Sequence, residues 1–388
     1  MSLKDKDKRY ISNTYKRFDV EIEKGKNATC FDFSGKEYID FTSGIGVNSL
    51  GFANEKINNA IVQQINKISH ISNLYYTEPC IKLSEKLCEI SKMDKVFFAN
   101  SGAEANEGAI KAARKYSFDK YGADRNEIIT LNKSFHGRTM ATLSATGQDY
   151  FHNYFHPFLE GFLYADADIK SISKKISSKT CAVMIEMIQG EGGVLPVDNT
   201  FVKELESLCN ELDILLIIDE VQTGIGRTGK FFAHEYAQIK PDIVTVAKGL
   251  GGGLPIGAIL FNEKVGGVFT YGNHGSTFGG NPVVCASALV VVDEIADEGF
   301  LNEVIKKGEH IEKKLLDLPH IKNVFYKGLM FGIEIDIEAI DVVNKAIENG
   351  LLLLTAKSKL RFLPPLTISY EELNKGLEIL SKVMLDLK

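Results

Sequence analysis

The 388-residue sequence has no run of 18 apolar residues, and its charged first ten residues have no apolar stretch behind them. A membrane-spanning helix needs about 20 mostly apolar residues, and an export signal needs an apolar segment after its charged start. We therefore expect a protein that is neither exported nor held in a membrane.

The sequence also has no C-x-x-C pair among its 6 cysteines, which stand at positions 30, 80, 88, 181, 209 and 285. A chain of this length does not need disulfides to hold its core together. We expect reduced thiols in a cytoplasmic protein, and no metal site.

Charge of neither sign dominates the composition. Lys and Arg total 45 and Asp and Glu total 51, which leaves a formal net charge of -6. Proteins that bind nucleic acid usually carry a marked basic excess, so we expect no nucleic-acid partner. The apolar share of 44% and the charged share of 25% are those of an ordinary globular protein, and the length allows two or more domains.

Proline is scarce, with 9 residues, whereas glycine is frequent, with 34. An excess of glycine in an ordered chain indicates tight turns and close approaches of the backbone. Both features are typical of a ligand-binding enzyme.

Short apolar segments alternate with helical patterns along the middle of the chain. Before them, Ile57, Ile61, Ile65 and Ile68 lie on one face of a helix expected at residues 54–68. The expected strands are residues 96–99, 128–131, 182–188, 214–218 and 243–247. This alternation predicts an α/β fold with a mostly parallel sheet covered by helices on both faces.

One strand should run against the others. Only residues 248–255 separate the strand at 243–247 from the next one at 256–261, and a parallel crossover needs a dozen or more residues. We therefore expect one antiparallel strand. We divide the chain into an N-terminal arm (1–60), a large α/β domain (61–287) and a small C-terminal α+β domain (288–388).

Two neighbouring strands end in residues suited to catalysis. Asp219 follows the strand at 214–218, and Lys248 follows the strand at 243–247. The carboxyl ends of parallel strands share one edge of the sheet, where open α/β sheets bind their ligands. A partly desolvated lysine has a lowered pKa and attacks carbonyls. If the carbonyl is that of pyridoxal phosphate, Asp219 keeps the pyridine nitrogen protonated; the alternatives are a solvated strand end and a surface lysine.

Such a cofactor needs a site for its phosphate. Residues 100–106 (NSGAEAN) follow a strand and open a helix, whose first N–H groups bind anions, and Gly102 lets a phosphate approach. The alternative is a simple capping box made by Ser101 and Glu104. A second segment, residues 224–230 (GIGRTGK), fits the nucleotide pattern G-x-x-x-x-G-K, but Phe231 stands where Ser or Thr is needed for magnesium. We do not expect a nucleotide triphosphatase.

Nine ordered motifs spread over nearly the whole chain resemble those of the class III (ω-amino acid) aminotransferases. They are YIDF at 38–41, SNLYY at 72–76, SGAEAN at 101–106, FHGRT at 135–139, IQGEGG at 188–193, DEVQTG at 219–224, AKG at 247–249, GSTFGGNP at 275–282 and LRFLPP at 360–365. The chain departs from the family at Met187, where proline is common. The resemblance implies a fold type I enzyme that uses pyridoxal 5'-phosphate.

The resemblance also implies a cofactor role for individual residues. Lys248 corresponds to the Schiff-base lysine, and Asp219 to the partner of the pyridine nitrogen. The remaining contacts it implies are Val221 and Phe135 on the two ring faces, Gln222 at the phenolic oxygen, and Gly102 and Ala103 at the phosphate. Thr277 corresponds to a threonine that reaches the phosphate of the neighbouring subunit, which implies a homodimer.

The substrate residues follow in the same way. Arg138, assisted by Tyr15, resembles the clamp for the carboxylate far from the reacting carbon, and Ser276 is a further substrate residue. Arg361 resembles the arginine that holds the α-carboxylate of glutamate, with Glu191 neutralising it when an ω-amine is bound. A guanidinium fits a carboxylate through two parallel hydrogen bonds. The plainer alternative for each arginine is a surface ion pair.

Substrate choice depends on Gly44. Ornithine-using members of the family carry a tyrosine in the segment that matches residues 42–46, so glycine leaves room for an acyl group on the α-nitrogen. We expect transfer of the δ-amino group of N2-acetylornithine to 2-oxoglutarate, in arginine biosynthesis. The alternatives are succinylornithine, N-succinyl-diaminopimelate, ornithine or 4-aminobutyrate as substrate, and a non-catalytic regulator that binds pyridoxal phosphate.

Overall fold

The computed structural model describes residues 2–387, and a seven-stranded sheet lies at its centre, with the strand order β4-β12-β11-β10-β7-β5-β6. The strands are β4 (Lys95–Ala99), β5 (Glu127–Leu131), β6 (Phe162–Ala165), β7 (Thr180–Glu186), β10 (Leu215–Asp219), β11 (Ile243–Val246) and β12 (Gly257–Phe261). Strand β12 pairs antiparallel with both of its neighbours, and the other pairs are parallel. The predicted sheet with one antiparallel strand is confirmed, with β6 added at its edge.

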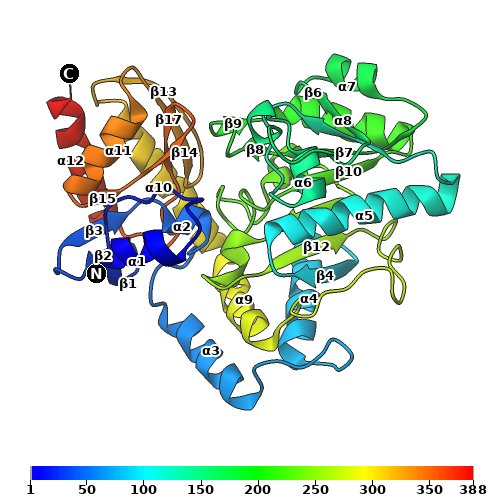
Figure 1. Cartoon of the computed structure of the whole chain (residues 1–388), viewed down its shortest axis with the longest axis horizontal. Coiled ribbons are helices and arrows are strands. Elements are labelled where there is room, and N and C mark those ends of the chain that lie inside the picture. The colour runs from blue at the N-terminus through cyan, green and yellow to red at the C-terminus, as the bar shows by residue number, and fades with distance from the viewer. Residues whose placement is uncertain (1, 388) are drawn as a thin grey trace.

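Helices cover both faces of this sheet, as Figure 1 shows. Helix α5 (Gly102–Tyr121) packs on one face and α8 (Asn199–Glu211) on the other. Consecutive residues of β10 divide between the two layers, because Ile217 joins the core under α5 and Ile218 joins the core under α8. Burial on both sides explains why these strands are apolar along their whole length.

Three further helices lie beside the sheet: α3 (Glu55–Lys67), α4 (Glu78–Ser91) and α9 (Pro282–Ile295). The helix predicted at residues 54–68 is confirmed as α3, and the Asn54 side chain caps it by accepting hydrogen bonds from the N–H groups of Lys56 and Ile57. Helix α9 packs against both α3 and α4. Within residues 2–387, no helix has the length and apolar character that crossing a membrane requires.

The C-terminal part has a sheet of its own. Its strands are β13 (Ile321–Lys327), β14 (Met330–Ile335), β17 (Lys359–Phe362) and β16 (Leu354–Ala356), in that order across the sheet. The accompanying helices are α10 (Glu298–Leu315), α11 (Ala339–Glu348) and α12 (Tyr370–Asp386). This is the α+β arrangement expected for the end of the chain.

The two ends of the chain share a third sheet. After α1 (Leu3–Tyr10), the strands β1 (Ile22–Lys26), β2 (Thr29–Asp32) and β3 (Glu37–Asp40) form a meander. Strand β15 (Leu351–Leu352) then pairs in parallel with β3. The blue and red ends of the chain accordingly lie together in Figure 1. The three-part division remains a proposal, and its second border falls within α9.

Candidate active site

A cavity of about 500 Å³ lies at the carboxyl ends of the parallel strands. Of the residues proposed from the sequence, those that line it are Gly102, Ala103, Phe135, Arg138, Asp219, Val221, Gln222 and Lys248. They come from positions up to 146 residues apart, since 248 - 102 = 146, and the parallel strands bring them to one edge of the sheet.

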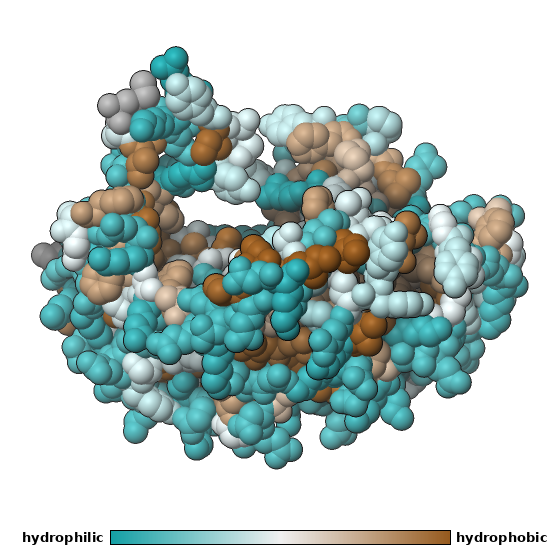
Figure 2. All heavy atoms as spheres, turned by 90° about the horizontal axis from the view of Figure 1, so that it is seen from below, coloured by the Kyte–Doolittle hydropathy of each residue, from teal (hydrophilic) through white to brown (hydrophobic). Residues whose placement is uncertain are grey.

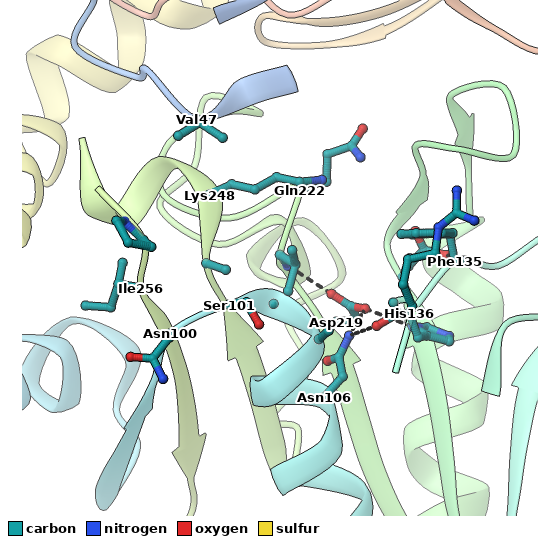
Figure 3. Close-up of a pocket in the computed structure, with 18 of the residues that line it drawn as sticks. Val47, Asn100, Ser101, Asn106, Phe135, His136, Asp219, Gln222, Lys248 and Ile256 are labelled. Atoms are coloured by element: carbon teal, nitrogen blue, oxygen red, sulfur yellow. Dashed lines mark hydrogen bonds and ion pairs between the residues drawn. The ribbon is translucent and has the colours of Figure 1, made fainter. Parts of the chain in front are cut away.

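Asp219 is held by donors from three different segments. Its Oδ2 accepts a hydrogen bond from Asn106 Nδ2 at 2.7 Å and lies 2.8 Å from His136 Nδ1, while its Oδ1 accepts the N–H of Val221 at 2.9 Å. Asn106 is itself oriented by the hydroxyl of Thr245, which donates to its Oδ1. Figure 3 shows Asp219 with its contacts to Asn106 and His136, and Lys248 lies above them in the view. The carboxylate is therefore buried and fixed in orientation.

Sequence reasoning assigned no role to Asn106 or His136. Asn106 lies in the SGAEAN motif and His136 in the FHGRT motif. Asn106 also lies one helical turn after Gly102, on the helix that faces the cavity. That spacing was the available signal for Asn106. For His136, the only signal in the sequence was its position directly after Phe135.

Lys248 follows β11 and has a left-handed backbone, with φ of 42°. Its side chain lines the cavity. Burial lowers its pKa, and the nearby charges of Glu191 and Asp219 oppose this only in part. The result is an amine that gives up its proton more readily than an exposed lysine does.

The N-terminus of α5 forms one wall of the cavity. Ser101 accepts the N–H of Glu104 and caps the helix, whereas the Glu104 carboxylate accepts the N–H of Asn100, so the capping box of the alternative interpretation is present only in part. Gly102 and Ala103 are the first two helical residues, so their N–H groups have no acceptor within the helix. A Cβ on Gly102 would lie 2.6 Å from Val221 Cγ1, so only glycine lets the helix approach this close. Capping and anion binding are therefore compatible here.

The wall opposite is aromatic and basic. The rings of Phe135 and Phe151 lie 5.6 Å apart, and the Arg138 guanidinium lies 4.3 Å from the centre of the Phe151 ring. The N–H of Phe135 donates to Glu186 Oε2 at 3.0 Å. Burial, and next the charge of Asp219, raise the pKa of Glu186 well above its usual value. Glu186, the last residue of β7, was not anticipated.

Arg361 and Glu191 contact each other beside this cavity. Arg361 Nη1 donates to Glu191 Oε1 at 2.5 Å, and the arginine is 4% exposed. Within residues 2–387, the buried Arg361 Nε has no hydrogen-bond partner. Burial alone would raise the pKa of Glu191, but the charge of Arg361 and its hydrogen bond lower it. Arg361 thus favours the charged form of Glu191, and the arginine keeps an unused donor.

Six proposed residues are not part of the cavity lining: Arg361 and Glu191, described above, and Ser276, Thr277, Tyr15 and Gly44. Ser276 and Thr277 lie in a separate depression together with Asn73, although Asn100, which lines the cavity, donates to Ser276 Oγ at 3.1 Å. Tyr15 is 74% exposed in the N-terminal segment. Gly44 is exposed in a turn, with φ of 64°.

The nucleotide-like segment, residues 224–230, is packed rather than open. A Cβ on Gly226 would lie 2.4 Å from Ile295, and one on Gly229 would lie 2.3 Å from Ile305. The segment leads into a short 3-10 turn, η2 (Ala233–Ala237), not into a long helix. These glycines serve close packing.

Fold and site together define a transaminase. The family model of the class-III aminotransferases matches residues 10–384. The chain belongs to this family, and it is a pyridoxal-phosphate-dependent aminotransferase of fold type I.

Individual relatives narrow the comparison. The chain is 51% identical, over 386 residues, to the acetylornithine aminotransferase of Haemophilus ducreyi, with 98% of each chain covered. An ornithine aminotransferase structure from Toxoplasma gondii, described with partial occupancy of pyridoxal phosphate at its active site, matches with a TM-score of 0.93 and 32% identity, covering 98% of this chain and 93% of that one. The N-acetylornithine aminotransferase structure from Stenotrophomonas maltophilia matches with a TM-score of 0.86 and 34% identity, covering 99% of both chains.

The cavity fits pyridoxal phosphate on observations of its own. The helix N-terminus offers two free N–H groups to a phosphate. The buried Gln222 Oε1 has no partner within residues 2–387, and the amide it belongs to lines the cavity. A buried carboxylate and a lysine of lowered pKa stand at the same edge of the sheet. The donor set matches a cofactor with a phosphate, a basic ring nitrogen and an aldehyde.

Proposed function

We propose that this enzyme transfers the δ-amino group of N2-acetylornithine to 2-oxoglutarate, giving N-acetylglutamate 5-semialdehyde and glutamate. The observation that carries the proposal is 44–51% identity to acetylornithine aminotransferases from several organisms over nearly the full length. The reaction belongs to arginine biosynthesis. We further propose a cytoplasmic location.

Pyridoxal phosphate, when bound, supplies an electron sink for the carbon that loses its proton. In our proposal, Gly102 and Ala103 bind the phosphate, Val221 and Phe135 contact the two faces of the ring, and Gln222 contacts the phenolic oxygen. Asp219 keeps a proton on the ring nitrogen. The donors from Asn106 and His136 support this role, because they hold the Asp219 carboxylate in one orientation.

Lys248 is proposed as both the attachment point of the cofactor and the group that moves the proton. Its Nζ takes a proton from the substrate carbon as a base and returns it as an acid. The lowered pKa of Lys248 supports this role, because a neutral amine is needed for the first step. A catalytic base works best when its pKa lies near the working pH.

Two arginines are proposed to bind the substrates. Arg138 clamps the carboxylate far from the reacting carbon, and Arg361 holds the α-carboxylate of glutamate. Glu191 neutralises Arg361 while acetylornithine is bound, since acetylornithine presents an amine rather than a carboxylate at that end. The contact between Glu191 and Arg361 and the unpartnered Arg361 Nε support this arrangement.

We propose that the active site is completed in a homodimer. Thr277 then reaches the phosphate in the neighbouring subunit, and Ser276 and Tyr15 contribute to the substrate site. Exposed apolar residues support an interface: Leu74 is 86% exposed, Tyr76 is 95% exposed and Phe278 is 61% exposed. Figure 2 shows apolar side chains gathered in a band on the lower face of the molecule.

The experiment that tests the function is amino-donor profiling of the purified holoenzyme with 2-oxoglutarate. We expect acetylornithine to be used with the highest kcat/KM. A preference for ornithine, succinylornithine, N-succinyl-diaminopimelate or 4-aminobutyrate would reassign the substrate within the family. The fold does not distinguish an ornithine aminotransferase from an acetylornithine aminotransferase, because the ornithine aminotransferase of Toxoplasma gondii has the same fold. The measurement with ornithine is therefore an essential part of the profile. The family match favours an enzyme over the non-catalytic regulator.

A further inference from the structure

The segment at residues 224–230 carries a buried arginine that the site described above does not use. Arg227 is 2% exposed. Its Nη1 donates to two carbonyl oxygens, that of Pro364 at 2.6 Å and that of Leu329 at 3.1 Å. The carbonyl of Arg227 in turn accepts the N–H of Leu329 at 3.0 Å. One side chain thus ties the loop that follows Asp219 to two segments of the C-terminal part.

The charge of a second buried group, Asp40, also acts on Arg227. Asp40, at the end of β3, is 1% exposed. Burial lowers the pKa of Arg227 to about 9, and the charge of Asp40 opposes that change. Asp40 Oδ1 accepts hydrogen bonds from the N–H and the hydroxyl of Thr42, at 2.7 and 2.6 Å. Through these hydrogen bonds, Asp40 fixes the start of the turn that follows β3.

This turn also holds the segment that follows the C-terminal strand β17. The four residues from Ser43 to Gly46 all have a left-handed backbone. Ser43 Oγ donates to the carbonyl of Leu363 at 2.6 Å, and the N–H of Leu363 donates to the carbonyl of Phe41 at 2.8 Å. Leu363 and Pro364 directly follow β17, the strand that carries Arg361.

We propose that Arg227 is the positioning residue that sets where Arg361 stands relative to Lys248, and so sets the affinity of the site for an α-carboxylate. Arg361 lies on the C-terminal sheet and Lys248 follows a strand of the large sheet, so a carboxylate bound between them needs a rigid connection of the two sheets. The planar guanidinium supplies it, because it reaches two carbonyls in a fixed geometry that a lysine ammonium does not reproduce. This inference rests on the proposed role of Arg361.

The test is Arg227→Lys in the full-length holoenzyme, with glutarate as an unreactive dicarboxylate probe. The substitution keeps the positive charge that faces Asp40, so we expect a folded protein. Glutarate affinity, measured by titration calorimetry, should fall roughly 10- to 100-fold, the usual effect of a small misplacement of a binding group. The KM for glutamate should rise by a similar factor, and the KM for acetylornithine should change less.

Arg125→Lys is the matched control. Arg125 also donates to backbone carbonyls, those of Thr180, Leu212 and Asp213, but none of these carbonyls adjoins the cavity. This variant should lose a similar amount of thermal stability and keep the glutarate affinity of the wild type. An equal loss of affinity in both variants would overturn the proposal, because it would follow from general loosening of the structure.

A second variant decides the matter if Arg227→Lys does not fold. Asp40→Asn combined with Arg227→Gln removes both buried charges and keeps the acceptor oxygen for Thr42. Weakened glutarate binding in this double variant supports the proposal, and wild-type binding in either folded variant overturns it. The glutarate experiment and the amino-donor profile test different proposals. A wild-type enzyme that prefers another amine refutes the proposed substrate, and the glutarate comparison between variants still tests the role of Arg227. A wild type that binds no glutarate refutes the role of Arg361 and this inference with it.

Discussion

Asp219 and Glu186 stand opposite each other at the ends of two neighbouring parallel strands, β10 and β7. Both side chains are buried, with Asp219 4% exposed and Glu186 6% exposed. Asp219 is surrounded by three donors, whereas Glu186 accepts the N–H of Phe135. Burial, and next the charge of Asp219, raise the pKa of Glu186 well above its usual value, so Glu186 keeps its proton to a higher pH than an exposed carboxyl group does.

The first prediction concerns the pH dependence of stability. Glu186 binds a proton in the folded state over a pH range in which the unfolded chain, with its usual pKa of 4.5, has lost it. Its contribution to stability is therefore fully present below that value and is lost as the pH rises towards the folded pKa. The slope is at most about 1.4 kcal/mol per pH unit. Glu186→Gln should remove this slope while keeping an acceptor for Phe135.

Urea unfolding of the two holoenzymes, followed from about pH 5 to about pH 8, measures the difference in slope. Activity at neutral pH should change little in Glu186→Gln, because the amide keeps the shape of the side chain and the oxygen that accepts the N–H of Phe135. Glu186→Leu, which removes the acceptor, is the contrasting variant. Parallel stability curves for wild type and Glu186→Gln would show that Glu186 is ionised in the folded protein.

The second prediction concerns Lys248. Lys248→Ala should abolish turnover without unfolding the protein, because it removes the proposed nucleophile and proton carrier at a strand end and not in a packed core. Borohydride reduction of the wild-type holoenzyme, followed by peptide mass spectrometry, should find the cofactor on Lys248 alone. Lys92→Ala is the control, since Lys92 also has a left-handed backbone, with φ of 59°. Label on any other lysine would refute the assignment.

The third prediction concerns the Glu191–Arg361 pair. Glu191→Ala should slow the half-reaction with acetylornithine about tenfold more than that with glutamate, equivalent to about 1.4 kcal/mol, because free Arg361 then attracts carboxylates in both. Single-turnover rates of the two half-reactions measure this. Glu191→Gln separates the lost charge from the lost hydrogen bond. Equal losses in both directions would make Glu191 a purely structural residue.

The fourth prediction concerns Gly44. A Cβ there would have space, since its nearest neighbour is Asn48 Nδ2 at 3.7 Å, but the φ of 64° is unfavourable for other residues. Gly44→Ala should therefore cost about 1 to 2 kcal/mol of stability with the substrate preference unchanged. Gly44→Tyr should add a drop of roughly 5- to 150-fold in kcat/KM for acetylornithine relative to ornithine.

Gly44→Asn is the control for the backbone, because asparagine tolerates a left-handed conformation better than other side chains. It should be nearly as stable as the wild type and keep its preference. A stable Gly44→Tyr variant that still prefers acetylornithine by the original ratio would remove Gly44 from the explanation of specificity.

The local pattern of the sequence determined most of the architecture. Apolar runs placed the strands β4, β5, β7, β10 and β11, because a strand buried on both faces is apolar throughout. The short connection after Ala247 determined that β12 is antiparallel, because the chain has no length for a crossover. The sequence pattern did not predict strand β6, because this strand is short and lies only partly buried at the edge of the sheet.

The tertiary structure decided which residues meet. Asp219 and Lys248 were predictable as neighbours because each follows one of two adjacent parallel strands. Four other contacts were not predictable: those of Asn106, His136 and Glu186 with Asp219, and that of Arg227 with Pro364. The two residues of each contact are separated in sequence by 33 positions (Glu186 and Asp219) to 137 positions (Arg227 and Pro364). Periodicity reports which face of an element is buried, whereas register and packing between distant segments determine which polar atoms lie within hydrogen-bond distance.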